Sequence, residues 1–329
     1  MSKRAVVAGA GGFIGHHLVR YLKDEGYWVR GVDLKEPEFE TSAADEFQLL
    51  DLRGSDACEA ATSGVDEVYQ LAADMGGIGY ITEFHADVAR NNVLINAHML
   101  EGARRNGVER YFYSSSACIY PMYRQEEADV TALKEEDAYP AEPEEGYGWE
   151  KLYAEKLCQY YTAEGKVDTR VARFHNIYGP LGTYEGGREK APAAICRKVA
   201  MSRDGDEIEI WGDGSQTRSF TYIDDCVEGI HRIMRSGHAS PLNLGSDELV
   251  SVDRLVDLVC EAAGKSLRKR HDTTKPQGVR GRNSDNSMAM GILGWAPATP
   301  LRVGIASTYR WIASEVERAG SVPAGAASG

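Results

Sequence analysis

Short apolar segments alternate with helical patterns along the first half of the chain. The apolar segments predict strands at residues 4–8, 27–32, 47–50, 67–71, 110–113 and 169–174. Between them, apolar residues recur with helical spacing at residues 14–25, 55–62, 89–106 and 147–163. Strands that alternate with helices pair in parallel through right-handed crossovers. The pattern therefore predicts an α/β fold, a parallel sheet with helices on both faces.

The alternation breaks up after Pro180. A helix is predicted at residues 191–200 and short strands at 208–210 and 218–221, which indicates a smaller lobe over the carboxyl edge of the sheet. Residues 225–234 and 241–244 are predicted to return to the sheet. We expect a main domain at residues 1–180, to which residues 222–248 return, and mainly the smaller lobe at 181–318. Residues 319–329, rich in Ala, Gly and Ser, are expected to form a disordered tail.

Charge and composition exclude several classes of protein. The 329 residues include 37 Lys+Arg and 50 Asp+Glu, for a formal net charge of −13. This balance argues against a nucleic-acid partner, and it means that a phosphate-bearing ligand must be held by local cations. No apolar run approaches the ~20 residues of a membrane span, and the first residues lack a signal-peptide layout, so we expect a cytoplasmic protein with no membrane partner. The six cysteines have no metal-binding spacing, which predicts reduced thiols and no metal site.

A glycine-rich loop connects the first predicted strand to the first predicted helix. Gly9, Gly12 and Gly15 form the pattern G-x-x-G-x-x-G, which also includes Phe13 and Ile14. Such glycines permit a tight turn and let the backbone approach a pyrophosphate, which then faces the N-terminus of the helix. Taken alone, the pattern is equally compatible with an ordinary glycine-rich loop.

The ends of the next strands carry residues that fit a dinucleotide. Asp33 ends the second predicted strand, about 20 residues after the glycine loop, where a carboxylate accepts a hydrogen bond from a ribose 2′-hydroxyl and repels a 2′-phosphate. This position favours NAD over NADP, and the alternative is a plain surface turn. The other residues expected along the adenosine and pyrophosphate are Asp51, Leu52, Leu71, Ala72 and Ala73.

Tyr147 and Lys151 form a Y-x-x-x-K pair on one face of a predicted helix. A lysine cation near a phenol favours the phenolate, so we expect Lys151 to lower the pKa of Tyr147 from about 10 toward neutrality. Ser116, at the end of the strand near residue 113, is placed to hydrogen-bond the same substrate hydroxyl. The three residues predict proton transfer at a hydroxyl group, although the pair alone is common by chance.

These residues together resemble the extended short-chain dehydrogenase/reductase family, specifically its nucleotide-sugar branch. The later segments 212–220, 243–246 and 293–297 also resemble signatures of that branch. The resemblance implies a Rossmann-type doubly wound sheet, a smaller substrate-binding lobe, and NAD that is held tightly and regenerated in each turnover.

Within this family, the chain is most similar to the GDP-mannose 3,5-epimerases. The similar segments are 71–77, 115–121, 174–180, 186–194 and 278–286. The resemblance implies a GDP-sugar substrate oxidised transiently at C4, with Cys118 and Lys190 as the acid/base pair that exchanges protons at C3 and C5. The chemistry also calls for such a pair, because inversion at a carbon needs a base on one face and an acid on the other. Taken alone, Cys118 would be a small buried hydrophobe and Lys190 a solvated surface lysine.

The substrate diphosphate requires cations in this acidic chain. Arg218, Arg280 and Arg282 are candidates because a guanidinium matches phosphate oxygens in pairs, although each is also compatible with a surface salt bridge. The remaining candidate substrate residues are Gly76, Gly77, Asn176, Glu189, Lys198 and Gln216, together with Ser116, Cys118 and Lys190.

Alternative functions remain open at this point. An epimerase for another nucleotide sugar or a GDP-heptose would use the same thiol and amine. A non-catalytic NAD-binding sensor is less compatible with an intact set of Ser116, Cys118, Tyr147, Lys151 and Lys190. The resemblance further implies a homodimer through the helices near residues 89–106 and 147–163.

Overall fold

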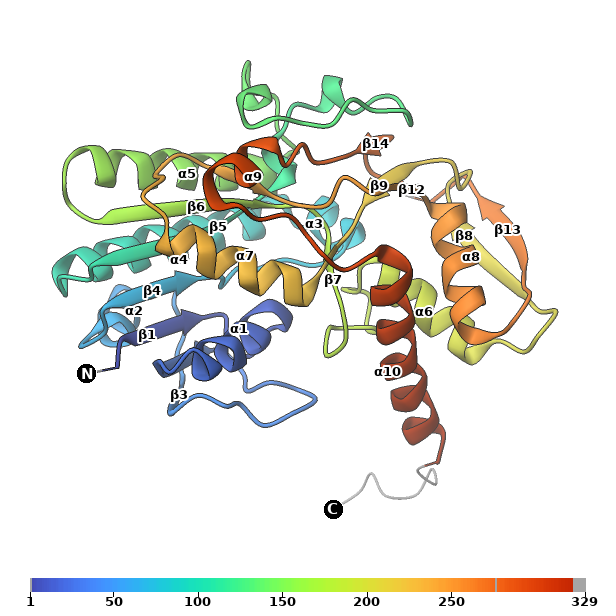
Figure 1. Cartoon of the computed structure of the whole chain (residues 1–329), viewed down its shortest axis with the longest axis horizontal. Coiled ribbons are helices and arrows are strands. Elements are labelled where there is room, and N and C mark those ends of the chain that lie inside the picture. Colours follow the sequence, from blue (N-terminus) through green and yellow to red (C-terminus); the bar gives the residue numbers. More distant parts are fainter. Residues whose placement is uncertain (1, 276, 322–329) are drawn as a thin grey trace.

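A sheet of seven parallel strands forms the centre of the computed structural model, which describes residues 2–275 and 277–321 (Figure 1). The strand order is β11-β6-β5-β4-β1-β2-β3. The chain builds outward from β1 to β3 and then reverses to β4, which pairs with the other side of β1. Ligands bind at such a reversal, outside the carboxyl ends of the strands. The strands are β1 (Arg4–Ala8), β2 (Trp28–Asp33), β3 (Glu46–Leu49), β4 (Glu67–Gln70), β5 (Arg110–Ser116), β6 (Asp168–Phe174) and β11 (Leu242–Leu244).

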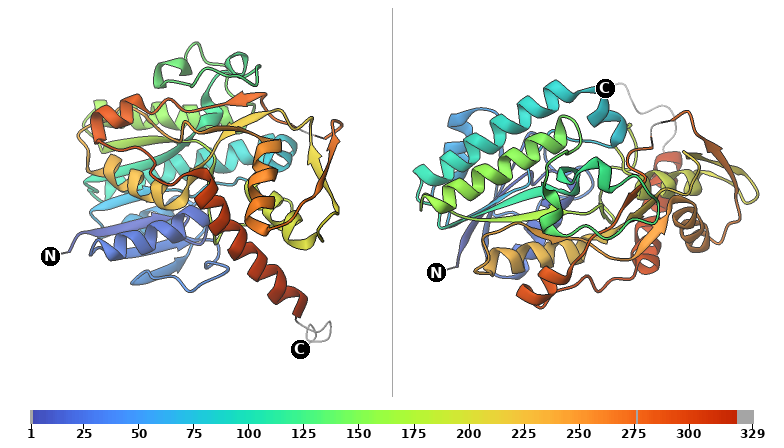
Figure 2. Two further views of the ribbon diagram at one scale, coloured as in Figure 1. Left: turned by 45° about the vertical axis from the view of Figure 1, so that its right-hand side comes forward. Right: turned by 90° about the horizontal axis from the view of Figure 1, so that it is seen from above.

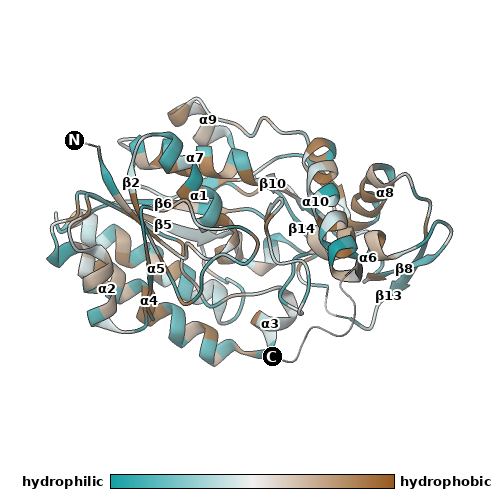
Figure 3. Ribbon diagram, turned by 90° about the horizontal axis from the view of Figure 1, so that it is seen from below, coloured by the Kyte–Doolittle hydropathy of each residue, from teal (hydrophilic) through white to brown (hydrophobic). Residues whose placement is uncertain are grey.

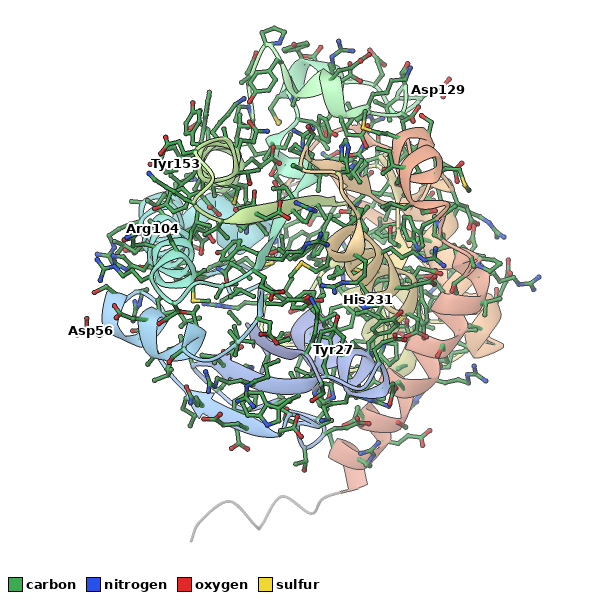
Figure 4. The ribbon with its side chains drawn as sticks, turned by 60° about the vertical axis from the view of Figure 1, so that its left-hand side comes forward. Tyr27, Asp56, Arg104, Asp129, Tyr153 and His231 are labelled. Carbon is green, nitrogen blue, oxygen red and sulfur yellow. The ribbon has the colours of Figure 1, made fainter. Side chains whose placement is uncertain are left out.

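Helices cover both faces of the sheet, as Figures 2 and 3 show. Helices α2 (Ser55–Thr62), α4 (His85–Arg105) and α5 (Tyr147–Ala163) lie on one face, and α1 (Phe13–Asp24) and α7 (Ile223–Arg235) lie on the other. The central strands are buried from both sides, which matches their continuous apolar sequence. On the second face, His231 of α7 contacts Tyr27, with ring centroids 6.1 Å apart (Figure 4).

A smaller group of elements lies beside the carboxyl ends of the strands (Figure 1). Helices α6 (Ala191–Met201), α8 (Val252–Ala263) and α10 (Leu301–Ser321) pack on one another there. Short strands complete this region, and β9 lies between β12 and β14. The remaining elements are α3 (Ile78–Glu83), β7 (Ile177–Tyr178), β8 (Glu207–Trp211), β9 (Thr217–Ser219), β10 (Thr221–Tyr222), β12 (Leu249–Ser251), β13 (Arg268–Asp272), β14 (Gly281–Arg282) and α9 (Ser287–Leu293).

The structure confirms the α/β fold class and the doubly wound parallel sheet. Strand β11 pairs with β6 in the main sheet. The sequence did not predict α8 or α10. The expected disordered tail began at residue 319, but α10 continues to Ser321, and residues 322–329 lie outside the described part of the chain. The assignment of domains stays a prediction.

The helices give no sign of a membrane crossing. Within residues 2–275 and 277–321, no helix combines the length and the apolar character that a crossing requires.

Candidate active site

A cavity of about 1300 Å³ runs along the carboxyl ends of the central strands and continues against the smaller lobe. The residues predicted to bind cofactor all line it: Gly9, Gly12, Phe13, Ile14, Gly15, Asp33, Asp51, Leu52, Leu71, Ala72, Ala73, Tyr147 and Lys151. The structure therefore brings the strand-end residues together along one wall.

The glycine loop can approach a ligand closely because side chains are excluded from it. Gly9 has φ +86°, and a Cβ there would lie 2.8 Å from the amide nitrogen of Ala72. A Cβ on Gly15 would lie 2.0 Å from the carbonyl oxygen of Gly9. Gly12 precedes α1 without a side-chain cap, so the first amides of that helix remain directed at the cavity. This backbone cradle fits a pyrophosphate.

Asp33 lies at the end of β2, beside the glycine loop. One carboxylate oxygen accepts a hydrogen bond from the Gly11 amide at 3.0 Å, and the other accepts one from the Leu34 amide at 2.6 Å. Burial raises the pKa of Asp33 above its usual value, while the amide hydrogen bonds oppose that shift. The placement fits the ribose of NAD, and with the glycine cradle it gives a site that matches the cofactor.

Ser116, Tyr147 and Lys151 meet where β5 ends against α5. The Lys151 ammonium donates to the carbonyl oxygen of Ser114 at 3.0 Å and lies 5.5 Å from the centre of the Tyr147 ring. Ser116 acts on Tyr147 and tends to lower its pKa. The prediction that Lys151 lowers the pKa of Tyr147 is wrong for the protein without ligand. Burial is the largest influence and raises the Tyr147 pKa well above 10, and burial also lowers the pKa of Lys151.

Cys118 lies in a short helical turn that follows β5 directly. Its amide donates to the Ser116 hydroxyl at 3.2 Å. Helix α5 approaches closely because it has a glycine at this point: a Cβ on Gly148 would lie 2.4 Å from the Cys118 carbonyl oxygen. Burial raises the pKa of the Cys118 thiol.

Lys190 reaches the same cavity from the smaller lobe, at the residue that precedes α6. Its side chain is open to the cavity, yet protein atoms surround it there, and this desolvation lowers its pKa. A thiolate at Cys118 would act in the opposite direction and raise the Lys190 pKa. Burial therefore makes the Lys190 ammonium a stronger acid and the Cys118 thiol a weaker acid than usual.

Most of the predicted substrate residues also line this cavity. The Arg218 guanidinium donates to the main-chain carbonyls of Thr217, Gln277 and Val279, and burial lowers its pKa to about 10. The Gln216 amide donates to the Trp211 carbonyl, while its buried oxygen has no partner in the described part of the chain. The other predicted residues on the cavity wall are Gly76, Gly77, Asn176, Glu189 and Lys198.

Two predicted arginines have different surroundings from those expected. Arg280 does not line the cavity, because its guanidinium pairs with both oxygens of Asp213, each at 2.9 Å. Arg282 does line the cavity, but it donates to Gln125, Glu144 and Cys118 within the protein. The role of Arg280 and Arg282 in holding a diphosphate therefore stays a prediction, and their hydrogen bonds within the protein do not favour it.

Sequence reasoning missed Glu144 and Gln125. Both contact Arg282, which is 138 and 157 positions away along the chain. Glu144 stands in an acidic stretch that reads as solvated surface, so no local signal distinguished it.

Comparison with known proteins agrees with this geometry. The model of the NAD dependent epimerase/dehydratase family matches residues 5–245. The chain belongs to that family. A relative from Oryza sativa subsp. japonica, named GDP-mannose 3,5-epimerase 1, is 51% identical over 317 residues, which cover 96% of this chain and 83% of that protein.

Solved structures show the same architecture. UDP-glucose 4-epimerase from Thermotoga maritima, 24% identical, superimposes with a TM-score of 0.86 over 95% of this chain and 99% of that one. UDP-glucuronic acid 4-epimerase from Bacillus cereus, solved with UDP-glucuronic acid and NAD, is 25% identical with a TM-score of 0.81 over 95% and 99% of the two chains. The predicted family and cofactor are confirmed: this chain is an NAD-dependent epimerase.

Proposed function

We propose that this epimerase inverts GDP-D-mannose at C3 and C5, to give GDP-L-galactose, GDP-L-gulose or both, through transient oxidation at C4. The observation that carries the proposal is the presence of Cys118 and Lys190 in the cavity that also holds Ser116, Tyr147 and Lys151. Inversion at C4 alone would need no thiol or second amine, because hydride leaves and returns there without carbon-acid chemistry. The 51% identity to the rice GDP-mannose 3,5-epimerase 1 supports the choice of sugar.

Tyr147 begins the reaction by removing the proton of the C4 hydroxyl, which Ser116 hydrogen-bonds. NAD held by the glycine loop and Asp33 would supply reversible hydride acceptance at C4, and its positive ring charge would favour the phenolate of Tyr147. Lys151 donates to the Ser114 carbonyl, and its side-chain nitrogen lies 5.5 Å from the centre of the Tyr147 ring. The sugar then carries a ketone at C4, which acidifies the C–H bonds at C3 and C5.

Cys118 and Lys190 carry out the inversion. One of them removes a proton from the carbon next to the ketone, which leaves an enolate, and the other returns a proton to the opposite face. Ser116 and Tyr147 stabilise the enolate oxygen by hydrogen bonding. After each inversion the base holds an extra proton and the acid lacks one, so exchange with water resets the pair. This reset is the route by which solvent hydrogen enters the sugar.

Arg218 is the cation that this proposal assigns to the diphosphate. It lines the cavity, and its described hydrogen bonds go to neutral main-chain carbonyls rather than to carboxylates. Lys198 supports it from α6.

The protein acts as a cytoplasmic homodimer in this proposal, with α4 and α5 forming the contact. These helices pack side by side (Figure 2). Helix α5 exposes Trp149, Tyr153 and Tyr160 to solvent at 46%, 54% and 59%. Tyr153 projects away from the sheet in Figure 4. Apolar rings on one helical face favour association with a second copy.

The proposed function is tested with GDP-mannose in heavy water. We expect deuterium at C3 and C5 of the recovered sugar, measured by NMR, with no net formation of NADH. Deuterium at only one of the two carbons would contradict the proposed inversion at the other carbon. If a different nucleotide sugar or a GDP-heptose exchanges and GDP-mannose does not, the substrate assigned to this enzyme would have to change to that sugar.

A further inference from the structure

Side chains from distant segments of the chain meet at Cys118. Arg282 of β14 donates through Nη1 to the Cys118 sulfur at 3.5 Å, through Nη2 to Glu144 Oε1 at 2.5 Å, and through Nε to Gln125 Oε1 at 2.6 Å. Arg282 is 6% exposed and Gln125 is 1% exposed, and the Glu144 side chain is 14% exposed. All three nitrogens of the Arg282 guanidinium therefore donate hydrogen bonds to groups of the protein.

The main chain fixes the same cluster. The Glu144 amide donates to the carbonyl oxygen of Cys118 at 3.0 Å. The Gln125 amide group donates to the carbonyls of Tyr120 and Pro121, at 3.1 and 3.2 Å. Because backbone and side-chain contacts agree, Glu144 and Cys118 are held at a fixed separation.

The thiol is held from two directions. Its sulfur accepts a hydrogen bond from Arg282, and the Glu144 carboxylate that Arg282 also binds interacts electrostatically with the thiol. A buried carboxylate next to a thiol is costly unless it is paired, and Arg282 supplies the pairing charge. The cluster thus places one anion, the Glu144 carboxylate, and one cation, the Arg282 guanidinium, beside the Cys118 sulfur.

We propose that Glu144 is a positioning residue, which holds the Cys118 thiol in the orientation and protonation state that proton exchange requires, with Arg282 as its balancing charge. The catalytic use of that thiol rests on the proposed function. The orientation itself rests only on the contacts given above. This assignment also explains why Arg282, although it lines the cavity, is engaged by protein groups rather than left for an anion.

The two charges act on the thiol in opposite directions. Glu144 raises the pKa of Cys118 and Arg282 lowers it, in addition to the larger effect of burial. The titratable and charged groups that face the thiol come from several elements: Glu144 before α5, Tyr147 and Lys151 on α5, Lys190 before α6, Arg218 on β9 and Arg282 on β14. A variant that lacks only Glu144 or only Arg282 keeps the other groups in place. The direction in which each variant shifts the pKa of the Cys118 thiol is therefore defined.

The first test measures the thiol without any sugar. The NAD-bound enzyme is alkylated with iodoacetamide across a range of pH, and the Cys118 peptide is followed by mass spectrometry. Glu144→Gln keeps a hydrogen-bond acceptor but removes the charge, so the alkylation midpoint should move to lower pH by on the order of one unit. Glu145→Gln removes the same charge from the neighbouring exposed residue and should leave the midpoint unchanged.

Arg282→Gln should move the alkylation midpoint in the opposite direction, to higher pH. If Glu144→Gln does not fold, this variant decides the claim by itself. An upward shift then supports the proposal, and an unchanged or lower midpoint overturns it. If both variants fold, a midpoint in Glu144→Gln equal to that of the wild type overturns it.

A second test uses solvent exchange into GDP-mannose. Glu144→Gln should keep the exchange, with its pH dependence displaced in the same direction as the alkylation midpoint. Glu144→Ala has no acceptor for the thiol and should lose exchange by at least about tenfold while NAD stays bound. Equal exchange in Glu144→Ala and the wild type overturns the positioning role. If the wild type itself shows no exchange, the proposed function fails, and the alkylation midpoints still decide the positioning of the thiol.

Discussion

The cofactor half of the cavity is made largely of backbone from neighbouring strand ends, whereas the proton-exchange half is made of side chains that converge from distant segments. In the first half, Gly9 and Gly15 leave no room for side chains, and Asp33 closes the next strand. In the second half, Cys118 follows β5, Lys190 precedes α6, and Arg282 belongs to β14. Under the proposed function, the first half holds the cofactor and the second determines which carbons of the sugar exchange protons.

The largest expected effect comes from the proton-exchange half. Cys118→Ala and Lys190→Ala should each reduce deuterium exchange from heavy water by about 10²- to 10⁴-fold, the usual range for a lost acid or base. Both variants should keep their NAD, which is measured by its absorbance after release from denatured protein. Cys260→Ala, at a buried cysteine outside the cavity, is the matched control and should exchange at the wild-type rate. Loss of NAD from Cys118→Ala or Lys190→Ala would mean that the proton-exchange half also contributes to cofactor binding, which contradicts the division into two halves.

A smaller effect is expected in the cofactor half. Asp33→Ala removes a charged acceptor for the ribose and should weaken NAD binding by about 10- to 100-fold, since a hydrogen bond to a charged group contributes ~1.5–3 kcal/mol. The preference for NAD over NADP should fall as well. Isothermal titration of protein stripped of cofactor measures both quantities, and Asp24→Ala on the exposed side of α1 serves as the control. Unchanged affinity in Asp33→Ala would assign that carboxylate to the structure of the loop alone.

The smallest effect separates two arginines of the smaller lobe. Arg218→Ala should raise the KM for GDP-mannose by about tenfold or more, with a lesser change in kcat, because it removes charge-assisted hydrogen bonds to the diphosphate. Arg280→Ala should change KM by less than about twofold, because Arg280 pairs with Asp213 outside the cavity. Steady-state kinetics on both variants test this pair, and equal effects would contradict the assignment of the diphosphate to Arg218.

Local patterns in the sequence predicted the cofactor half well. Alternating apolar and helical segments gave the parallel sheet, and the glycine loop and Asp33 lie where their spacing predicted. Ser116 and Tyr147, which are proposed as catalytic, lie at the end of β5 and in α5, where local sequence predicted them to lie.

Local sequence patterns could not predict contacts between distant segments of the chain. Nothing near Glu144 or Arg282 in the sequence indicates that the two side chains form an ion pair. Phe39, Tyr184 and Trp311 likewise meet as an aromatic cluster, with Phe39 and Trp311 ring centroids 4.9 Å apart, although they belong to segments separated along the chain. The pKa of Tyr147 was predicted in the wrong direction because residue spacing shows the nearby lysine but not the depth of burial.

Transient oxidation at C4 is the central claim, and GDP-mannose carrying deuterium at C4 tests it most directly. In ordinary water, the account predicts that the C3,C5-epimerised product and the recovered substrate keep the label at C4, because the hydride leaves that carbon and returns to it without meeting solvent. Enzyme quenched during turnover should release reduced nicotinamide that carries this deuterium, whereas epimerisation without oxidation at C4 would leave the cofactor unlabelled. Formation of epimerised sugar that has lost its C4 deuterium to water would contradict the account.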